Sequence, residues 1–403
     1  MIQVTSAEEI INSVTLEISS LEVPISEAAG RVLREPITSD RDLPPFDRVM
    51  MDGIAIQYDQ WEGGQRSFVV EGLQKAGDPK RSLAEAPNCL EVMTGAILPG
   101  NTDTVIRYED VEIRQKEAHS VAVIQKDPKA KRQNIHARGT NRQKDDLIIE
   151  EGVVLSPAEI GVAATVGKSA IKVSKPPRVA VISTGDELVA IDEKPLPHQI
   201  RRSNVHTLSA ALRELDIKAK LFHLNDEQSE ISDKLGHILE RFDLLILSGG
   251  VSKGKLDYIP ELLEQKGVEK LFHKVRQRPG KPFWFGRSEQ AVVFALPGNP
   301  VSTFSCYCRY IAPWLKKQIG LKAGKQPVAR LTEDYSFSKD LTYFLQVNVS
   351  VSDKGILEAR PVKGKGSSDL ANLCWADGFL ELPEDRNKFK KGECFPLYLF
   401  RPL

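Results

Sequence analysis

The segment Ser248-Gly-Gly-Val-Ser-Lys-Gly-Lys-Leu-Asp257-Tyr258 lies at the centre of the stretch that decides the fold, residues 178–317. It follows the apolar run 243–248, and two similar runs, 178–183 and 291–296, lead into turns that begin at Thr184 and Pro297. Continuous apolar runs of this length are typical of buried parallel strands.

Segments of helical length separate or follow these runs: 203–215, 226–241, 257–266 and 301–317. The alternation of strands and helices predicts βαβ units and an open, doubly wound sheet. Such sheets bind ligands outside the carboxyl ends of their strands. Because each of the three turns follows a strand, we expect the turns to meet in one crevice that contains the active site.

The composition is typical of an ordinary globular protein. A chain of 403 residues predicts more than one domain. Lys plus Arg and Asp plus Glu each total 55, so no global charge favours nucleic acid or an anionic membrane as a partner. Five cysteines without metal-ligand spacing predict reduced thiols. With neither a signal-like amino terminus nor an apolar run of about 18 residues, we expect a cytoplasmic protein.

Outside residues 178–317 the pattern changes twice. A capping-box pattern at Ser6 predicts a first helix, and 26–33 predicts a short second one. Short alternating runs in 47–146 predict a small β domain. Residues 155–167 have the cap and proline signals of one compact helix, and 323–403 again have a β-like pattern.

The turn after the second run predicts an anion site. Gly249 and Gly250 allow the backbone to approach a ligand, and a following helix would point its N–H groups at a negative charge. The hydroxyls of Thr184, Ser248 and Ser252 can bond phosphate oxygens. The glycine spacing fits neither a dinucleotide fingerprint nor a P-loop. The turns therefore predict a phosphate site of another kind.

Charged residues are expected to surround this site. Arg278 and Lys281, near the last strand, suit oxyanions. Carboxylates beside an anion site suggest a bridging Mg²⁺, and the candidates are Glu187, Asp226, Asp257 and, from the β domain, Asp52. The alternative is that Asp226 and Asp257 cap helices and that Asp52 forms a turn.

Six motifs in order along the chain resemble one family, the MoeA family of molybdopterin molybdenumtransferases, which includes the carboxy-terminal domain of gephyrin. The motifs are Pro45-Phe-Asp with Met51-Asp-Gly53, Met93-Thr-Gly-Ala96, Ser183-Thr-Gly-Asp-Glu-Leu188, Ser248-Gly-Gly-Val-Ser252 with Asp257-Tyr258, Pro279-Gly-Lys-Pro282, and Leu296-Pro-Gly-Asn-Pro-Val-Ser302.

The resemblance implies an activity in molybdenum cofactor biosynthesis. Members of the family insert molybdenum from molybdate into adenylylated molybdopterin and release AMP in a Mg²⁺-dependent step. The family also implies a homodimer with sites shared between subunits, and a partner to which the product passes.

The resemblance further implies roles for individual residues. Catalytic roles would fall to Asp52, Glu187, Asp226 and Asp257, and the metal ligands would be Glu187, Asp226, Asp257 and Asn141. Substrate would contact Thr184, Gly185, Ser248, Gly249, Gly250, Ser252, Lys274, Arg278, Lys281, Pro297, Pro300 and Ser367.

By resemblance, the fold class is multidomain α/β and β, and four domains are expected. They are a split, elongated helical domain (1–38 plus 147–175), an inserted β domain (39–146), a doubly wound, molybdopterin-binding-like α/β domain (176–322) and a carboxy-terminal β-barrel (323–403).

The chain departs from the family pattern at three places. Arg48, Val49, Met50 and Ile54 surround Asp52, Asn141 stands where the family usually has a carboxylate, and 339–346 replaces an arginine-containing pattern, although Ser367 and Ser368 remain. Two other functions stay open. One is a catalytically weakened or non-catalytic paralogue that binds the pterin as a scaffold, and the other is a related pterin adenylyltransferase or nucleotide pyrophosphatase.

Overall fold

The computed structural model describes the chain except residues 117–118, 252–257, 323 and 403. By internal contacts the chain forms two compact units. The first contains Met1–Arg34, Gly152–Ser156 and Ala170–Leu403, and the second contains Glu35–Glu151 and Pro157–Ser169.

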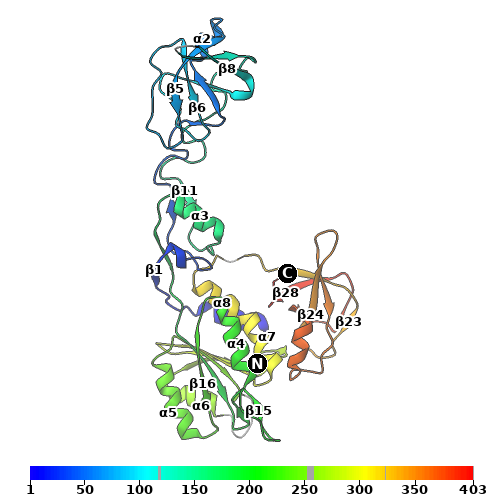
Figure 1. Ribbon diagram of the computed structural model, residues 1–403. Helices are drawn as coiled ribbons and strands as arrows, with labels where there is room; N and C mark the ends of the chain where they lie inside the picture. The colour runs from blue at the N-terminus through cyan, green and yellow to red at the C-terminus, as the bar shows by residue number, and fades with distance from the viewer. Residues whose placement is uncertain (117–118, 252–257, 323, 403) are drawn as a thin grey trace. The chain divides into compact units, whose positions relative to one another are not determined.

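A six-stranded sheet is the centre of the first unit (Figure 1). Its order is β16 (Ala219–Leu224), β13 (Val179–Thr184), β17 (Leu244–Ser248), β21 (Val292–Leu296), β20 (Trp284–Arg287) and β18 (Glu269–His273). The first four strands are parallel, and β20 runs antiparallel to both its neighbours. The three predicted strands are β13, β17 and β21, which are adjacent, so their carboxyl ends lie at one edge.

Helices cover both faces of this sheet (Figure 1). Val179 and Val181 pack in the cluster that includes α1, α4 and the run α7, η3 and α8, whereas Ala180 and Ile182 pack with α5 and α6. This split follows from the alternation of side chains along a strand. The bounds are α1 (Val4–Ser13), α4 (Ser203–Arg213), α5 (Gln228–Leu239), α6 (Ile259–Gln265), α7 (Pro300–Cys306), the π-helical turn η3 (Tyr307–Ile311) and α8 (Ala312–Gln318). The doubly wound α/β prediction is confirmed.

The carboxy-terminal part of the first unit contains a closed five-stranded barrel. Around the barrel the order is β24 (Thr342–Val351), β25 (Leu357–Pro361), β22 (Val328–Leu331), β28 (Cys394–Leu399) and β26 (Gly378–Leu382). The barrel closes because β24 pairs with both β25 and β26. A short strand from the α/β part, β19 (Gln277–Arg278), pairs with the start of β24. Smaller elements are β23 (Tyr335–Ser336), which pairs with β27 (Lys388–Phe389), and η4 (Leu370–Trp375).

The start of the chain corrects two expectations. Helix α1 exists, but it begins at Val4 and its N-cap, Gln3, makes no side-chain cap hydrogen bond, so the capping role of Ser6 is wrong. Residues 26–33 contain only a 3₁₀ turn, η1 (Ile25–Glu27). Gly30 has a φ of +81°, and the amide of Leu33 donates to Val153 O, so this stretch joins extended neighbours instead of a helix.

Extended pairs complete the first unit. They are β1 (Ser20–Pro24) with β12 (Ala170–Ser174), and β14 (Leu188–Val189) with β15 (Ile200–Arg201). None of the helices in the described part of the chain has the length and apolar character needed to span a bilayer.

The second unit is mainly β structure, as the alternating runs predict. Its six-stranded sheet has the order β7 (Thr104–Arg107), β4 (Gly53–Ile56), β6 (Asn88–Val92), β5 (Ser67–Gln74), β9 (Ser120–Ile124) and β8 (Val111–Gln115). Ile54, Phe68, Cys89 and Ile106 lie in its core. The remaining elements are β2 (Ile37–Thr38) with β11 (Leu147–Ile149), β3 (Arg48–Val49) with β10 (Ile135–His136), α2 (Tyr58–Glu62), η2 (Tyr108–Asp110) and α3 (Pro157–Thr165).

Candidate functional site

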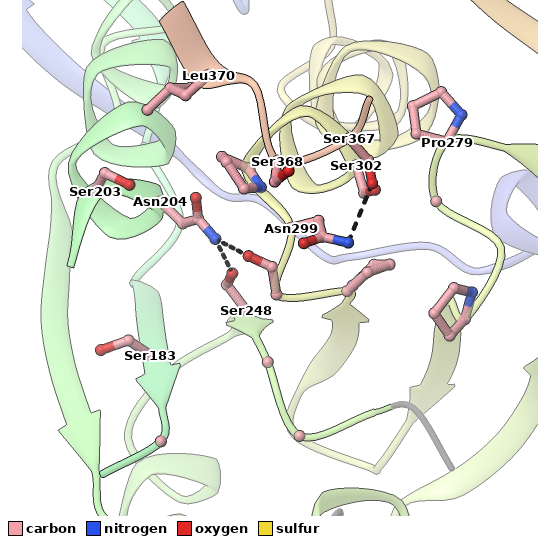
Figure 2. Close-up of a pocket in the computed structure, with 18 of the residues that line it drawn as sticks. Ser183, Ser203, Asn204, Ser248, Pro279, Asn299, Ser302, Ser367, Ser368 and Leu370 are labelled. Atoms are coloured by element: carbon pink, nitrogen blue, oxygen red, sulfur yellow. Dashed lines mark hydrogen bonds between the residues drawn. The ribbon is translucent and has the colours of Figure 1, made fainter. Parts of the chain in front are cut away.

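A cleft of about 1100 Å³ lies at the carboxyl ends of β13, β17 and β21, within the first unit (Figure 2). The turns after the three strands, the start of α4 and the loop after β19 line it. The barrel contributes Lys339, Leu341, Ser367, Ser368 and Leu370. The glycine turns thus meet in one crevice, where the strand order requires them to meet.

Most of the residues expected to bind substrate line this cleft. They are Thr184, Gly185, Ser248, Gly249, Gly250, Arg278, Lys281, Pro297, Pro300 and Ser367, together with the carboxylates Glu187 and Asp226. Lys274 is not among the lining residues. Ser252 and Asp257 lie outside the described residues, and Asp52 and Asn141 belong to the second unit.

The turn after β17 requires glycine for two physical reasons. Gly249 has a φ of +108°, in the region that L side chains rarely adopt, and a Cβ there would lie 2.7 Å from Thr184 Oγ1. Gly250 has a φ of +68°, and its Cβ would lie 2.7 Å from Ile259 Cγ1. The turn packs directly on the neighbouring strand end and on α6, which leaves its backbone facing the cleft.

Asn204, in the first turn of α4, ties the strand ends together, and the sequence reasoning missed it. Its Nδ2 donates to Ser248 Oγ at 2.8 Å and to the carbonyl oxygen of Gly298 at 2.7 Å (Figure 2). Thr303 Oγ1 donates to the carbonyl of Pro297 at 2.6 Å. The side chain of Asn204 therefore fixes the turn after β17 against the turn after β21.

The lining side chains have an excess of positive charge. The lining includes two carboxylates, Glu187 and Asp226, and five cationic side chains, which are Arg201, Arg202, Arg278, Lys281 and Lys339. Focused positive potential in a cleft favours anionic ligands. Arg201, Arg202 and Asn299 were also missed from sequence. For the two arginines the available signal was the polar run Arg201-Arg202-Ser203-Asn204 just before and at a helix start, and for Asn299 it was the motif 296–302.

The two carboxylates fit part of a magnesium site. A Cβ on Gly185 would collide with the carboxylate of Glu187, so that carboxylate folds back over the turn. Asp226 does not cap α5, because the N-cap of that helix is Glu227. The backbone amide of Asp226 donates to Asp186 Oδ1 at 2.9 Å. Among the described residues, no group of three His, Cys, Asp or Glu side chains could hold a metal ion. Mg²⁺ commonly uses one or two carboxylates together with substrate phosphates, so Glu187 and Asp226 are compatible with it.

In the second unit, the two remaining candidates for the catalytic or metal site, Asp52 and Asn141, have hydrogen-bond partners. Asp52 Oδ1 accepts hydrogen bonds from the hydroxyl and the amide of Thr94, at 2.7 and 2.6 Å, and these bonds lower the pKa of the Asp52 carboxyl. Asn141 Oδ1 lies 3.1 Å from His136 Nε2, and Arg48 Nη2 lies 3.2 Å from Nδ1 of the same ring. Two of the residues that depart from the family pattern, Arg48 and Asn141, thus contact the same histidine.

Asn204→Asp should destabilise the first unit by about 1–3 kcal/mol, because the donating amide is replaced by an oxygen that faces the carbonyl of Gly298. Urea unfolding of the wild type and the variant measures the difference. Asn12→Asp, in helix α1 and away from the cleft, is the control. Equal stability of both variants would contradict the bridging role of Asn204.

Three family models match successive parts of the chain. The MoeA N-terminal region (domains I and II) matches residues 2–167, a probable molybdopterin-binding domain matches 180–317, and the MoeA C-terminal region (domain IV) matches 328–400. Together with the cleft, these matches place the protein in a class of multidomain proteins built on a molybdopterin-binding-type α/β fold.

Relatives extend this similarity over the full length. A protein of Synechocystis named molybdopterin molybdenumtransferase is 39% identical over 99% of this chain and 100% of its own length. A Haemophilus influenzae protein of the same name is 30% identical over 94% of this chain and 93% of its own. The crystal structure of a molybdopterin biosynthesis MoeA protein from Pyrococcus horikoshii has a TM-score of 0.86 at 29% identity and covers 100% of both chains. The chain belongs to the MoeA family, the molybdopterin molybdenumtransferases.

Proposed function

We propose that this protein inserts molybdenum, supplied as molybdate, into adenylylated molybdopterin and releases AMP in a Mg²⁺-dependent step. The observation that carries the proposal is the cleft itself, in which three glycine turns, five cations and two carboxylates meet at the carboxyl ends of parallel strands. The names of the full-length relatives support the same reaction. A cleft of about 1100 Å³ has room for a substrate of nucleotide size and a small oxyanion.

Each wall of the cleft suits one part of these substrates. The backbone of the Gly249–Gly250 turn, with the hydroxyls of Thr184 and Ser248, suits the phosphates of the adenylylated pterin. Arg278 and Lys281, with Lys339 and Ser367 from the barrel, suit molybdate, because fixed cations and hydroxyls bind oxyanions.

The carboxylates have a different role. Glu187 and Asp226 would hold Mg²⁺ against the phosphates, where the ion would neutralise the charge that develops as the bond to AMP breaks. Asp257 would complete this set by family resemblance. Glu187→Gln tests the assignment through the Mg²⁺ concentration needed for half-maximal activity, which should rise.

The direct test of the reaction uses the purified protein with adenylylated molybdopterin, molybdate and Mg²⁺. We expect release of AMP that depends on molybdate and stops when the divalent cation is chelated. A preparation that binds the pterin substrate but releases no AMP would refute the catalytic proposal.

A non-catalytic pterin-binding paralogue is the second candidate, and Asn141 favours it. Its amide lies against His136 instead of offering the carboxylate usual in the family. Under this alternative the wild type binds the substrate without turnover, and Asn141→Asp restores AMP release. Gln143→Glu is a matched control, because it adds a charge of the same sign two residues away on an exposed side chain. No gain with Asn141→Asp would count against this candidate.

A pterin adenylyltransferase or nucleotide pyrophosphatase is less well supported, because the family matches include the flanking segments 2–167 and 328–400.

We also propose a homodimer in the cytoplasm that hands its product to a partner protein. Light scattering on the purified protein tests the dimer, and a monomeric mass at micromolar concentration would overturn it.

A further inference from the structure

The helix that begins at the cleft with Pro300 changes from α-helical to π-helical geometry at Tyr307. Helix α7 continues as the π-helical turn η3 and then as α8, which has a proline, Pro313, near its start. Proline has no N–H to donate and its ring crowds the carbonyl four residues earlier, that of Arg309. Single π-helical turns inside α-helices are rare and frequently lie at functional positions.

Arg309, within this turn, is a buried arginine with partners on two other parts of the unit. Its side chain is 5% exposed. Nη2 donates to Glu8 Oε2 of α1 at 2.7 Å, and Nε donates to Glu381 Oε2 of β26 at 2.7 Å. The guanidinium carbon also lies 4.9 Å from the ring centroid of Tyr398, in β28. One guanidinium therefore joins the helix behind the cleft to the barrel and to the first helix of the chain.

The bond to Glu381 connects Arg309, through the pairing of β26 with β24, to the barrel residues that line the cleft. Glu381 pairs in register with Phe344 of β24, and β24 begins one residue after Leu341, which lines the cleft with Lys339. A second connection lies at the start of α7, where the amide of Val301 donates to the carbonyl of Ser367 at 3.0 Å and Asn299 Nδ2 donates to Ser367 Oγ at 3.1 Å. The barrel thus contacts the α7–η3 helix at both of its ends.

A buried ion pair of this kind is weak evidence for stability, since well-packed apolar side chains often serve as well. The guanidinium of Arg309 instead restrains the relative positions of its partners, because two of its N–H groups must each align with a specific carboxylate. Apolar contacts such as Phe304 with Phe379, whose ring centroids are 6.3 Å apart, also join the two surfaces but do not require a particular hydrogen-bond partner.

We propose that Arg309 is a positioning residue that, through Glu381, sets the placement of Lys339, Ser367 and Ser368 in the cleft. It touches no substrate and acts on the oxyanion only through the barrel wall. The assignment of an oxyanion to that wall rests on the proposed function, whereas the restraint on the barrel does not.

The two carboxylate partners of Arg309 provide two variants that differ in whether the weakened bond reaches the barrel. Glu381→Gln and Glu8→Gln each weaken one 2.7 Å bond to the same guanidinium, but only the first bond holds the barrel. Both variants should remain folded, and urea unfolding measures the stability that each loses. Neither residue lines the cleft.

Hydrogen exchange tests the restraint without any substrate. We expect the amides of Val301 and Thr342, which bond Ser367 O and Arg276 O, to exchange faster in Glu381→Gln and at the wild-type rate in Glu8→Gln. Equal exchange at these two amides in both variants would overturn the proposal, whatever the protein's reaction.

Kinetics then tests the consequence for the cleft. A binding group misplaced by about 1 Å can cost up to about a hundredfold, so we expect Glu381→Gln to raise the KM for molybdate by roughly tenfold. The KM for the adenylylated pterin should change little, and Glu8→Gln should leave both constants as they are. Equal rises in both variants, or none in Glu381→Gln, would refute the positioning role. If the wild type shows no molybdate-dependent reaction, the proposed function fails while the exchange result still stands.

Discussion

Val181→Asp should abolish cooperative folding of the first unit. Val181 is fully buried in β13, which has a parallel neighbour on each side, and its side chain packs in the main core. An unpaired carboxylate in this place would have to lose its hydration or open the core, and either costs several kcal/mol. This is a large part of the roughly 5–15 kcal/mol by which most proteins are stable.

Soluble yield and the urea unfolding profile measure this effect. Leu221→Asp is the control, because Leu221 pairs in register with Val181 on the edge strand β16 but is 37% exposed. We expect the control to lose about 1 kcal/mol or less, as surface substitutions do. A Val181→Asp protein that unfolds cooperatively with near wild-type stability would contradict the position of β13 in the sheet.

Lys281→Met should have the largest effect on the proposed reaction. Lys281 lines the cleft in the loop beside Arg278, where its ammonium group suits a molybdate oxygen. A hydrogen bond to a charged group contributes about 1.5–3 kcal/mol. We therefore expect the KM for molybdate to rise by roughly 10- to 150-fold, since 1.4 kcal/mol corresponds to a factor of ten.

The control for this prediction is Lys316→Met, which removes the same charge from an exposed position in α8 that does not line the cleft. It should leave the KM unchanged. A second readout separates binding from folding, because thermal unfolding of Lys281→Met should occur near the wild-type temperature. An unchanged KM for Lys281→Met would remove Lys281 from the oxyanion site.

The sheet could be predicted because a short stretch of sequence is enough to identify each of its central strands. Each of β13, β17 and β21 is a continuous apolar run, and burial on both faces is what such a run requires. The glycine turns could be placed at one edge because parallel strands end on the same side. The helix expected at 26–33 failed because its residues satisfy their backbone groups with distant partners such as Val153, and a propensity read over a short window contains no information about such partners.

The site was predicted only in part. Residues in recognisable turns, such as Gly249 and Lys281, were found, whereas Asn204, Arg201 and Arg202 were not, since they lie where β15 leads into α4 and have no motif of their own. Their presence in the cleft depends on the packing of α4 beside the carboxyl ends of β13 and β17.

By itself, the sequence determined the alternating α/β core, the β structure on both sides of it, and the family, because apolar periodicity and ordered motifs are properties of neighbouring residues. Only the tertiary structure decided which distant side chains share the cleft, how Asn204 joins two strand ends, and that Arg309 connects α1, the π-helical turn and the barrel. These contacts join residues as far apart as Glu8 and Glu381. The pairing of residues so distant in the chain is set by the packing of whole elements and not by local pattern.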